Sequence, residues 1–317
     1  MMLFHLLILL ISSLALIQAT IKIIHALEKI SHFFALRDFS IAFILMAVAT
    51  SLPELFVGIT SAVADAPALS LGNVLGSNIV NLTLVIGLVV LVSGGINARS
   101  IIVRRDALYM AVFATVPILM LLDGLFSRID SIIVLVFYFL YLTRLLSQRT
   151  AFKERHNHVT AKEALLNFWI FIAGVAVLLL SAEGIVFASK RIALDLGIAL
   201  SLVGMFFVSL GTSLPEIVFE LKAVKRNQSG LALGDLVGSV VANATLVLGV
   251  TGLIRPIEVD FLNVFLAPVI YLLVALLIFE VFVRTDKKLV SWEGLLLVLM
   301  YIMFLLTEIG LQYYRPV

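Results

Sequence analysis

Long apolar segments dominate this sequence and leave it very few possible folds. A helix that crosses a bilayer needs about 20 consecutive apolar residues, and the chain offers ten segments of about that length. Hydrophobic residues fill 62% of the 317 positions and charged residues only 13%. We therefore predict an all-α integral membrane protein with ten transmembrane helices. Their expected ranges are 3–24, 39–62, 69–94, 106–122, 129–146, 164–188, 197–221, 230–254, 261–283 and 289–309.

The basic residues of the loops predict the orientation of the chain. Lys and Arg concentrate in cytoplasmic loops, and with an external N-terminus 17 of the 22 would be cytoplasmic. We therefore expect a multi-pass protein of the plasma membrane with both termini extracellular. A formal net charge of +2 gives no basic surface for nucleic acid. The chain has no Cys, which excludes thiolate metal sites and disulfides.

A gap-free internal repeat covers the middle of each half of the sequence. Residues 49–87 and 211–249 are identical at 15 of 39 positions, at a constant offset of 162. Five predicted helices separate the copies, so the second copy enters the membrane from the opposite side. Inverted repeats of this kind are typical of transporters, with the binding site at the repeat interface. The predicted units are a first five-helix half (1–147, repeat region about 39–94), a short cytoplasmic linker (148–163) and an inverted second half (164–317, repeat region about 197–254).

Each copy contains a TSLPE motif whose glutamate lies inside a predicted helix. An ionised carboxylate in hydrocarbon costs at least ~2.5 kcal/mol, and the central parts of the predicted helices contain no Lys or Arg. A bound cation or a proton therefore remains as the partner. The Thr and Ser of the motif share roughly one side of the helix with the glutamate. The candidate ligands from this motif are Thr50, Ser51 and Glu54 in the first copy, and Thr212, Ser213 and Glu216 in the second.

The proline of each motif predicts a break in its helix, because proline lacks an N–H. Carbonyls loosened before Pro53 and Pro215, around 47–49 and 209–211, can become ligands where they line a cavity. All these donors are hard oxygens, which suit Ca²⁺ and equally Na⁺. The alternative is a plain kink in which the hydroxyls bond back to the helix, but it leaves both glutamates unexplained.

A second repeated motif pairs two glycines with a Ser and an Asn. Gly72 and Gly76, like Gly234 and Gly238, are spaced to allow close helix packing. We expect this packing to bring predicted helix three against helix two, which directs the polar residues towards the carboxylate. The alternative role for these residues is hydrogen bonding between helices. They are Ser77 and Asn81 in the first copy, and Ser239 and Asn243 in the second.

TSLPE followed by GNxxGSNxxN, duplicated in inverted orientation, resembles the cation/Ca²⁺ antiporter superfamily, and most of all its prokaryotic Na⁺/Ca²⁺ exchangers. The resemblance covers essentially the whole chain. It implies that helices two, three, seven and eight enclose the ions, and that helices one and six slide across them. It implies ligation of Ca²⁺ and Na⁺ by Glu54, Glu216, Thr50, Ser51, Thr212, Ser213, Ser77 and Ser239, by the carbonyls of Ala47 and Ser209, and with Asn81 and Asn243 flanking the centre.

The second copy departs from the motif pattern at three positions. Asp235 stands where the family usually has Asn, Val240 where the first copy has Asn78, and Asn243 where many members carry Asp. Asp235 is either an additional ligand or, as we favour, a cap of the helix start near water. Glu220 corresponds to Gly58 of the first copy, and we expect it near the entrance beside Lys222.

These features predict a secondary antiporter that exchanges Na⁺ for Ca²⁺ by alternating access. The alternative is an H⁺/Ca²⁺ or K⁺-dependent Na⁺/Ca²⁺ exchanger of the same fold. The sequence has no HExxH or GxSxG motif, so we do not expect an enzyme. We expect no cofactor beyond the transported Ca²⁺ and Na⁺, and no partner other than these ions and the lipid bilayer.

Overall fold

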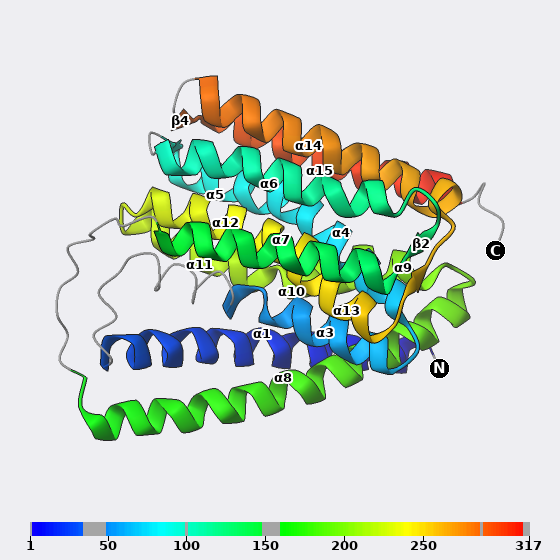
Figure 1. The fold of residues 1–317 in the computed structure, drawn as a ribbon, viewed down its shortest axis with the longest axis horizontal. Helices are drawn as coiled ribbons and strands as arrows, with labels where there is room; N and C mark the ends of the chain where they lie inside the picture. The colour runs from blue at the N-terminus through cyan, green and yellow to red at the C-terminus, as the bar shows by residue number, and fades with distance from the viewer. Residues whose placement is uncertain (1, 34–48, 99–100, 148–158, 286–287, 313–317) are drawn as a thin grey trace.

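The protein is helical almost throughout, and its helices lie in layers (Figure 1). The computed structural model describes residues 2–33, 49–98, 101–147, 159–285 and 288–312. Two long helices, α1 (Met2–Phe33) and α8 (Ala161–Leu196), pack against each other along one side. On the opposite side lie α14 (Leu266–Thr285) and α15 (Ser291–Gln312).

The repeat regions occupy the space between these two layers. Those of the first half are α3 (Leu52–Val63), α4 (Pro67–Val80), η1 (Asn81–Val85) and α5 (Ile86–Ser93). Those of the second half are α9 (Leu200–Val203), η2 (Gly204–Val208), α10 (Ser209–Thr212), α11 (Leu214–Lys225), α12 (Ser229–Ala242), η3 (Asn243–Val247) and α13 (Leu248–Ile254). The remaining helices are α6 (Ile101–Met120), α7 (Arg128–Ser147) and the π-helical turn η4 (Phe261–Phe265).

Two short antiparallel ladders join the first half of the chain to the second. Strand β1 (Ile96–Asn97) pairs with β4 (Lys288–Leu289), and β2 (Leu125–Phe126) pairs with β3 (Ile257–Glu258). The two ladders lie at opposite ends of the helices (Figure 1). At each end of the molecule, one β-ladder therefore joins the two halves of the chain.

Seven helices in the described residues are long and apolar enough to cross a membrane. Helix is also present in the three other predicted ranges, as α3, α6 and α7, but these are not among the seven. The number of ten spans therefore stays a prediction. The predicted second helix begins in residues 39–48, and most of the predicted linker is residues 148–158; both lie outside the described residues.

π-Helical turns begin at the two repeat-related asparagines, Asn81 and Asn243. In each turn a threonine hydroxyl donates to the carbonyl four residues back: Thr83 to Ile79, and Thr245 to Val241 at 2.6 Å. A hydroxyl that occupies this carbonyl competes with the backbone N–H that would normally bond there. The repeated Thr therefore gives a local reason for the widened turn, a feature that is frequent at functional sites.

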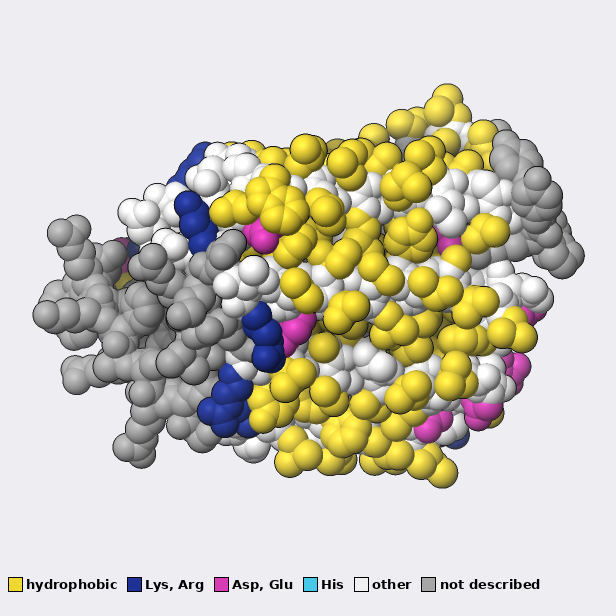
Figure 2. Space-filling model, turned by 90° about the horizontal axis from the view of Figure 1, so that it is seen from above, with side chains coloured by type: hydrophobic (Ala, Val, Ile, Leu, Met, Phe, Trp, Pro, Cys, Tyr) yellow, Lys and Arg dark blue, Asp and Glu magenta, His cyan; other side chains and the backbone are white. Residues whose placement is uncertain are grey.

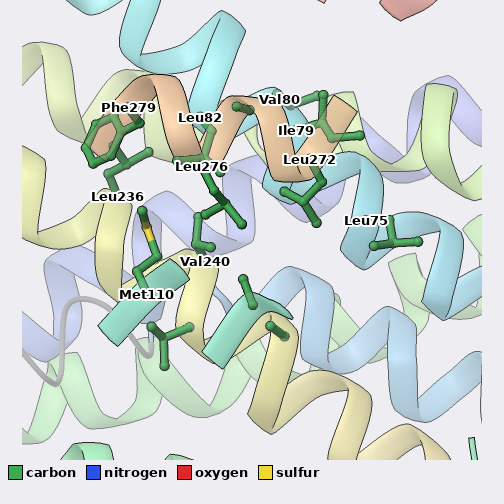
Figure 3. Packing of buried hydrophobic residues seen from close by; sticks show 14 of the residues in the cluster. Leu75, Ile79, Val80, Leu82, Met110, Leu236, Val240, Leu272, Leu276 and Phe279 are labelled. Carbon is green, nitrogen blue, oxygen red and sulfur yellow. The ribbon is translucent and has the colours of Figure 1, made fainter. Parts of the chain in front are cut away.

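A buried apolar core packs around α4 and α12. Figure 3 shows side chains from α4, α6, α12 and α14 meeting there, among them Ile79, Val240 and Leu276. A second cluster joins α1 and α8 to the repeat helices through residues such as Leu16 and Ile185. The site-bearing segments are thus held between two packed layers.

The surface in Figure 2 is covered by hydrophobic side chains over its middle, with Lys and Arg gathered towards one end. Exposed leucines and isoleucines are numerous on α1, α8 and α15. An apolar belt bounded by charges matches the polarity of a lipid bilayer. The chain is a multi-pass membrane protein.

The glycines of the first repeat pack differently from our expectation. A Cβ at Gly72 would lie 1.9 Å from the Ser201 carbonyl oxygen, and one at Gly76 would lie 2.4 Å from that of Met205. These glycines therefore face α9 and η2 of the second half, not predicted helix two. Helix α4 does pack against α3 as predicted, but the assignment of the glycines to that contact was wrong, because GxxxG spacing specifies close packing without specifying the partner.

Candidate ion-binding site

The two TSLPE motifs form matching breaks in the helices. Ser51 and Ser213 have nearly the same backbone angles (φ −84°, ψ 1° and φ −88°, ψ 2°), and a new helix begins after each. Glu54 and Glu216 lie in the first turns of these helices, α3 and α11. The positive end of a helix dipole favours a negative group there. The predicted break is confirmed for the second copy, where α10 ends at Thr212; the residues before position 49 are not described.

Both glutamates are completely buried, with 0% of each side chain exposed. Ser77 donates a long hydrogen bond of 3.4 Å to Oε1 of Glu54. Three other carboxylate oxygens, Oε2 of Glu54 and both of Glu216, have no hydrogen-bond partner. Buried charges are normally paired or bound to a metal ion. These oxygens therefore form a cluster of strong acceptors without a donor.

Hydroxyl groups connect the two repeats around these carboxylates. Thr50 of the first repeat lies 3.2 Å from the Ser239 hydroxyl of the second. In the same way, Ser77 of the first repeat lies 3.3 Å from the Thr212 hydroxyl of the second. All four side chains are buried. The structure thus brings the predicted Thr and Ser residues of both motifs together at one interface.

Ser51 and Ser213 are also buried, and neither hydroxyl has a hydrogen-bond partner. At Ser209 the hydroxyl donates to the Met205 carbonyl. The Ser209 carbonyl, a predicted ligand, accepts from the Ser213 N–H at 3.0 Å and from Thr212 at 3.3 Å. It is therefore already engaged in this structure. Ala47, the other predicted carbonyl ligand, lies outside the described residues.

Two buried asparagines that we did not predict as ligands belong to the same network. Asn73 accepts a hydrogen bond of 3.2 Å from Thr212, and Asn78 accepts one of 3.2 Å from Asn243. The amide of Asn81 is fully buried without a partner, as is the Asn243 oxygen. The GNxxGSN stretch already contained Asn73 and Asn78, so their position in the motif was the available signal.

Two acidic residues lie deeper than we expected. Asp235 is only 1% exposed and stands well inside α12, which begins at Ser229. It accepts a 3.1 Å hydrogen bond from Thr50, so the prediction that it caps a helix near water is wrong. Glu220 is 0% exposed, so the expected position at the entrance is also wrong. Hydropathy locates a residue along a span, but the packing of α11 against α12 decides its exposure.

The four buried carboxylates influence one another through space. Glu216 interacts electrostatically with Glu54, Asp235 and Glu220. Among the described residues none of the four has an ion-pair partner. In the same described ranges, no three acidic or His side chains converge closely enough to hold one metal ion. Any ion here would therefore bind to one or two carboxylates completed by hydroxyl, amide and carbonyl oxygens, as hard cations do.

Comparison with known proteins finds a matching family model and relatives that align along most of the chain. Residues 4–146 and 166–310 match the family model of the sodium/calcium exchanger protein. An uncharacterized membrane protein of Methanocaldococcus jannaschii is 31% identical over 87% of this chain and 88% of its own length. The sodium/calcium exchanger MaX1 of Methanosarcina acetivorans is 25% identical over 94% of this chain and 97% of its own.

A solved structure shares the fold along nearly the whole chain. The sodium-calcium exchanger NCX_Mj, soaked with 10 mM Na⁺ and no Ca²⁺, superposes with a TM-score of 0.67 at 28% identity, covering 96% of this chain and 98% of that one. The family and the fold are those of membrane transporters of the exchanger type. The chain belongs to the sodium/calcium exchanger family.

Proposed function

We propose that this protein is a secondary antiporter that exchanges Na⁺ for Ca²⁺ by alternating access. Its two halves would be inverted five-helix repeats, with the ions held between Glu54 and Glu216 at their interface. The relatives named sodium/calcium exchangers support Ca²⁺ and Na⁺ as the substrates. The remaining ligands would be the Thr, Ser and Asn oxygens of the two motifs, with Asp235 as a further candidate.

One observation carries this proposal: three of the four fully buried carboxylate oxygens of Glu54 and Glu216 lack a hydrogen-bond donor. Leaving a charged group desolvated and unpaired is very costly. A bound cation removes that cost, and the hydroxyls of Thr50, Ser77 and Thr212 at the same interface are neutral oxygen donors that suit Na⁺ and Ca²⁺.

Competition for the same carboxylates would couple the two ion flows. Two positive ions in a poorly screened interior repel each other strongly. Ca²⁺ and a full set of Na⁺ ions therefore do not share the site, and binding of one expels the other. Na⁺ would be carried across the membrane in one half of the transport cycle and Ca²⁺ in the other.

The moving part would be the α1–α8 pair. These helices pack closely on each other, since a Cβ at Gly184 would lie 2.2 Å from the Ser12 hydroxyl. Helix α1 of this pair also touches the break in the second repeat, where a Cβ at Gly211 would lie 3.2 Å from the Ser13 hydroxyl. A joint shift of α1 and α8 would expose the site to one side of the membrane at a time.

The basic end of the molecule would face the cytoplasm of the plasma membrane. Lys222 and Lys225 lie in the last turn of α11, and Arg284 near the end of α14. Cytoplasmic loops carry the excess of Lys and Arg. Both termini would then be extracellular.

Reconstituted proteoliposomes test the proposal directly. An outward Na⁺ gradient should drive ⁴⁵Ca²⁺ uptake, and Glu54→Gln and Glu216→Gln should abolish it while the purified variants stay monodisperse. Glu258→Gln, an acid-to-amide change at an exposed position on β3, is the matched control and should transport normally. Uptake that ignores the Na⁺ gradient would refute Na⁺ coupling.

The alternative is H⁺ coupling, favoured by the number of buried carboxylates without a cationic partner. Such a group can take up a proton in the return step in place of Na⁺. Uptake that follows an imposed pH gradient in Na⁺-free buffer would support it. A requirement for K⁺ together with Na⁺ would indicate the K⁺-dependent exchanger instead.

A further inference from the structure

Glu220 is a buried acid that the exchange of one Ca²⁺ between Glu54 and Glu216 does not use. It lies on α11 one turn beyond Glu216, towards the end that carries Lys222 and Lys225. Its side chain is completely buried, and neither carboxylate oxygen has a hydrogen-bond partner. A carboxylate in such a place normally faces a partner or a water-filled path.

The repeat-related position in the first half has different surroundings from those of Glu220. Its counterpart is Gly58, where a Cβ would lie 2.7 Å from the Thr251 hydroxyl and 3.0 Å from that of Ser70. Those two hydroxyls are hydrogen-bonded to each other at 2.9 Å. Beside Gly58, this place is therefore filled by one hydroxyl from each half of the chain, and the two hydroxyls satisfy each other.

The second half has no such pair. At the offset of 162, Val89 corresponds to Thr251 and Ala232 to Ser70, and both are fully buried. Neither side chain can donate a hydrogen bond. Since α11 packs against α5 just as α3 packs against α13, the repeat places apolar side chains near Glu220 where two hydroxyls lie beside Gly58.

Asp235 is a second buried acid in this region, and it interacts electrostatically with Glu54. It also interacts electrostatically with Glu220, and α11 packs against α12, which carries it. One Asp235 oxygen accepts from Thr50, and the other has no partner. The counterparts in the first half are Gly58 and the neutral Asn73, so two additional negative charges occur in the second half alone.

We propose that Glu220 and Asp235 bind one alkali cation in addition to the ions held between Glu54 and Glu216. This inference rests on the proposed function and adds an accessory site to it. The three carboxylate oxygens that lack hydrogen-bond partners, two on Glu220 and one on Asp235, supply the ligands.

The closeness of the sites selects a monovalent ion. Glu220 and Glu216 are four residues apart on α11, about 6 Å along the helix axis. Repulsion between two ions grows with the product of their charges, so a second Ca²⁺ at that distance would be repelled twice as strongly as Na⁺. Apolar Val89 and Ala232 also provide none of the neutral oxygens that Ca²⁺ needs to reach six to eight ligands.

Displacement of ⁴⁵Ca²⁺ from the purified protein by Na⁺ tests the proposal. Wild type and the matched control Glu258→Gln should show the same steep Na⁺ dependence. Glu220→Gln should bind ⁴⁵Ca²⁺ in Na⁺-free buffer, but its Hill coefficient for Na⁺ displacement should fall by about one, because one linked binding event is lost. A parallel series with added K⁺ distinguishes the two alkali ions. If K⁺ makes the displacement of Ca²⁺ steeper in wild type but not in Glu220→Gln, the site binds K⁺.

An unchanged Hill coefficient with both ions in Glu220→Gln would overturn the accessory site. So would loss of Ca²⁺ binding by a monodisperse Glu220→Gln, which would make Glu220 part of the Ca²⁺ site itself. Should the Gln variant aggregate, Glu220→Gly, which installs the residue found at position 58, takes its place in the same measurement. Absence of Ca²⁺ binding by wild type would instead refute the proposed function.

Discussion

Substitution of Gly72 by alanine tests how closely the two halves are packed at the site. Gly72 lies on α4, one turn before Gly76 and Ser77, and its missing side chain lets α4 approach α9. An added Cβ would lie 1.9 Å from the Ser201 carbonyl oxygen and 2.7 Å from its carbonyl carbon. Both obstacles are backbone atoms, so no side-chain rotation relieves the overlap.

The size of the effect follows from this overlap. Ordinary contact begins near 3.4 Å, so α4 and α9 would have to separate by about 1.5 Å. Overpacking of a core typically costs about 1–3 kcal/mol, and a clash with backbone belongs at the upper end. Each kcal/mol corresponds to about 2–4 °C in Tm for chains of 150–250 residues. We therefore expect the Tm of Gly72→Ala to fall by about 5–10 °C.

Thermal unfolding of the purified protein, followed by tryptophan fluorescence, measures this shift. Gly310→Ala is the matched control, because nothing lies within 4 Å of a Cβ built at that position. It should unfold at the wild-type temperature or slightly above it, since Ala favours a helix over Gly. Equal Tm values for Gly72→Ala and Gly310→Ala would refute the close packing of the halves.

Three further predictions concern single side chains. Thr212→Val removes hydrogen bonds to Asn73 and Ser77 and should weaken ⁴⁵Ca²⁺ binding about fivefold, at about 1 kcal/mol for such a bond; unchanged affinity would exclude Thr212 from the site. Thr245→Val frees the Val241 carbonyl and should convert η3 into regular α-helix in a solved structure of the variant; a persisting π-helix would contradict our explanation. Lys190→Met removes the hydrogen bond that the α8 side chain donates to the carbonyl of Ala64, the residue that follows α3. At about 1 kcal/mol for the bond, the Tm should fall by about 2–4 °C. An unchanged Tm would show that this bond contributes nothing to stability.

The local events at the site were predictable because each has a cause within a few residues. Proline at positions 53 and 215 removes a backbone N–H and disfavours helical geometry in the residue before it, and the repeat offset pairs the residues around it. Burial of Glu54 and Glu216 likewise follows from their position inside long apolar segments that contain no basic partner.

Partners across the interface were not predictable in the same way. The sequence predicted close helix packing at Gly72, but only the tertiary arrangement shows that α9, and not α3, fills the space beside it. Asp235 and Glu220 were misplaced for the same reason. Depth along a helix can be counted from the sequence, whereas the direction a residue faces depends on neighbours from the other half of the chain.

The most direct test of the account is to locate the ion itself. Crystals soaked with Ca²⁺ or Sr²⁺ in Na⁺-free solution should give an anomalous peak in contact with carboxylate oxygens of both Glu54 and Glu216, at about 2.3–2.6 Å for Ca²⁺. High Na⁺ should remove that peak. A saturating soak that leaves both glutamates without an ion, or that places the ion against neither of them, would contradict the account.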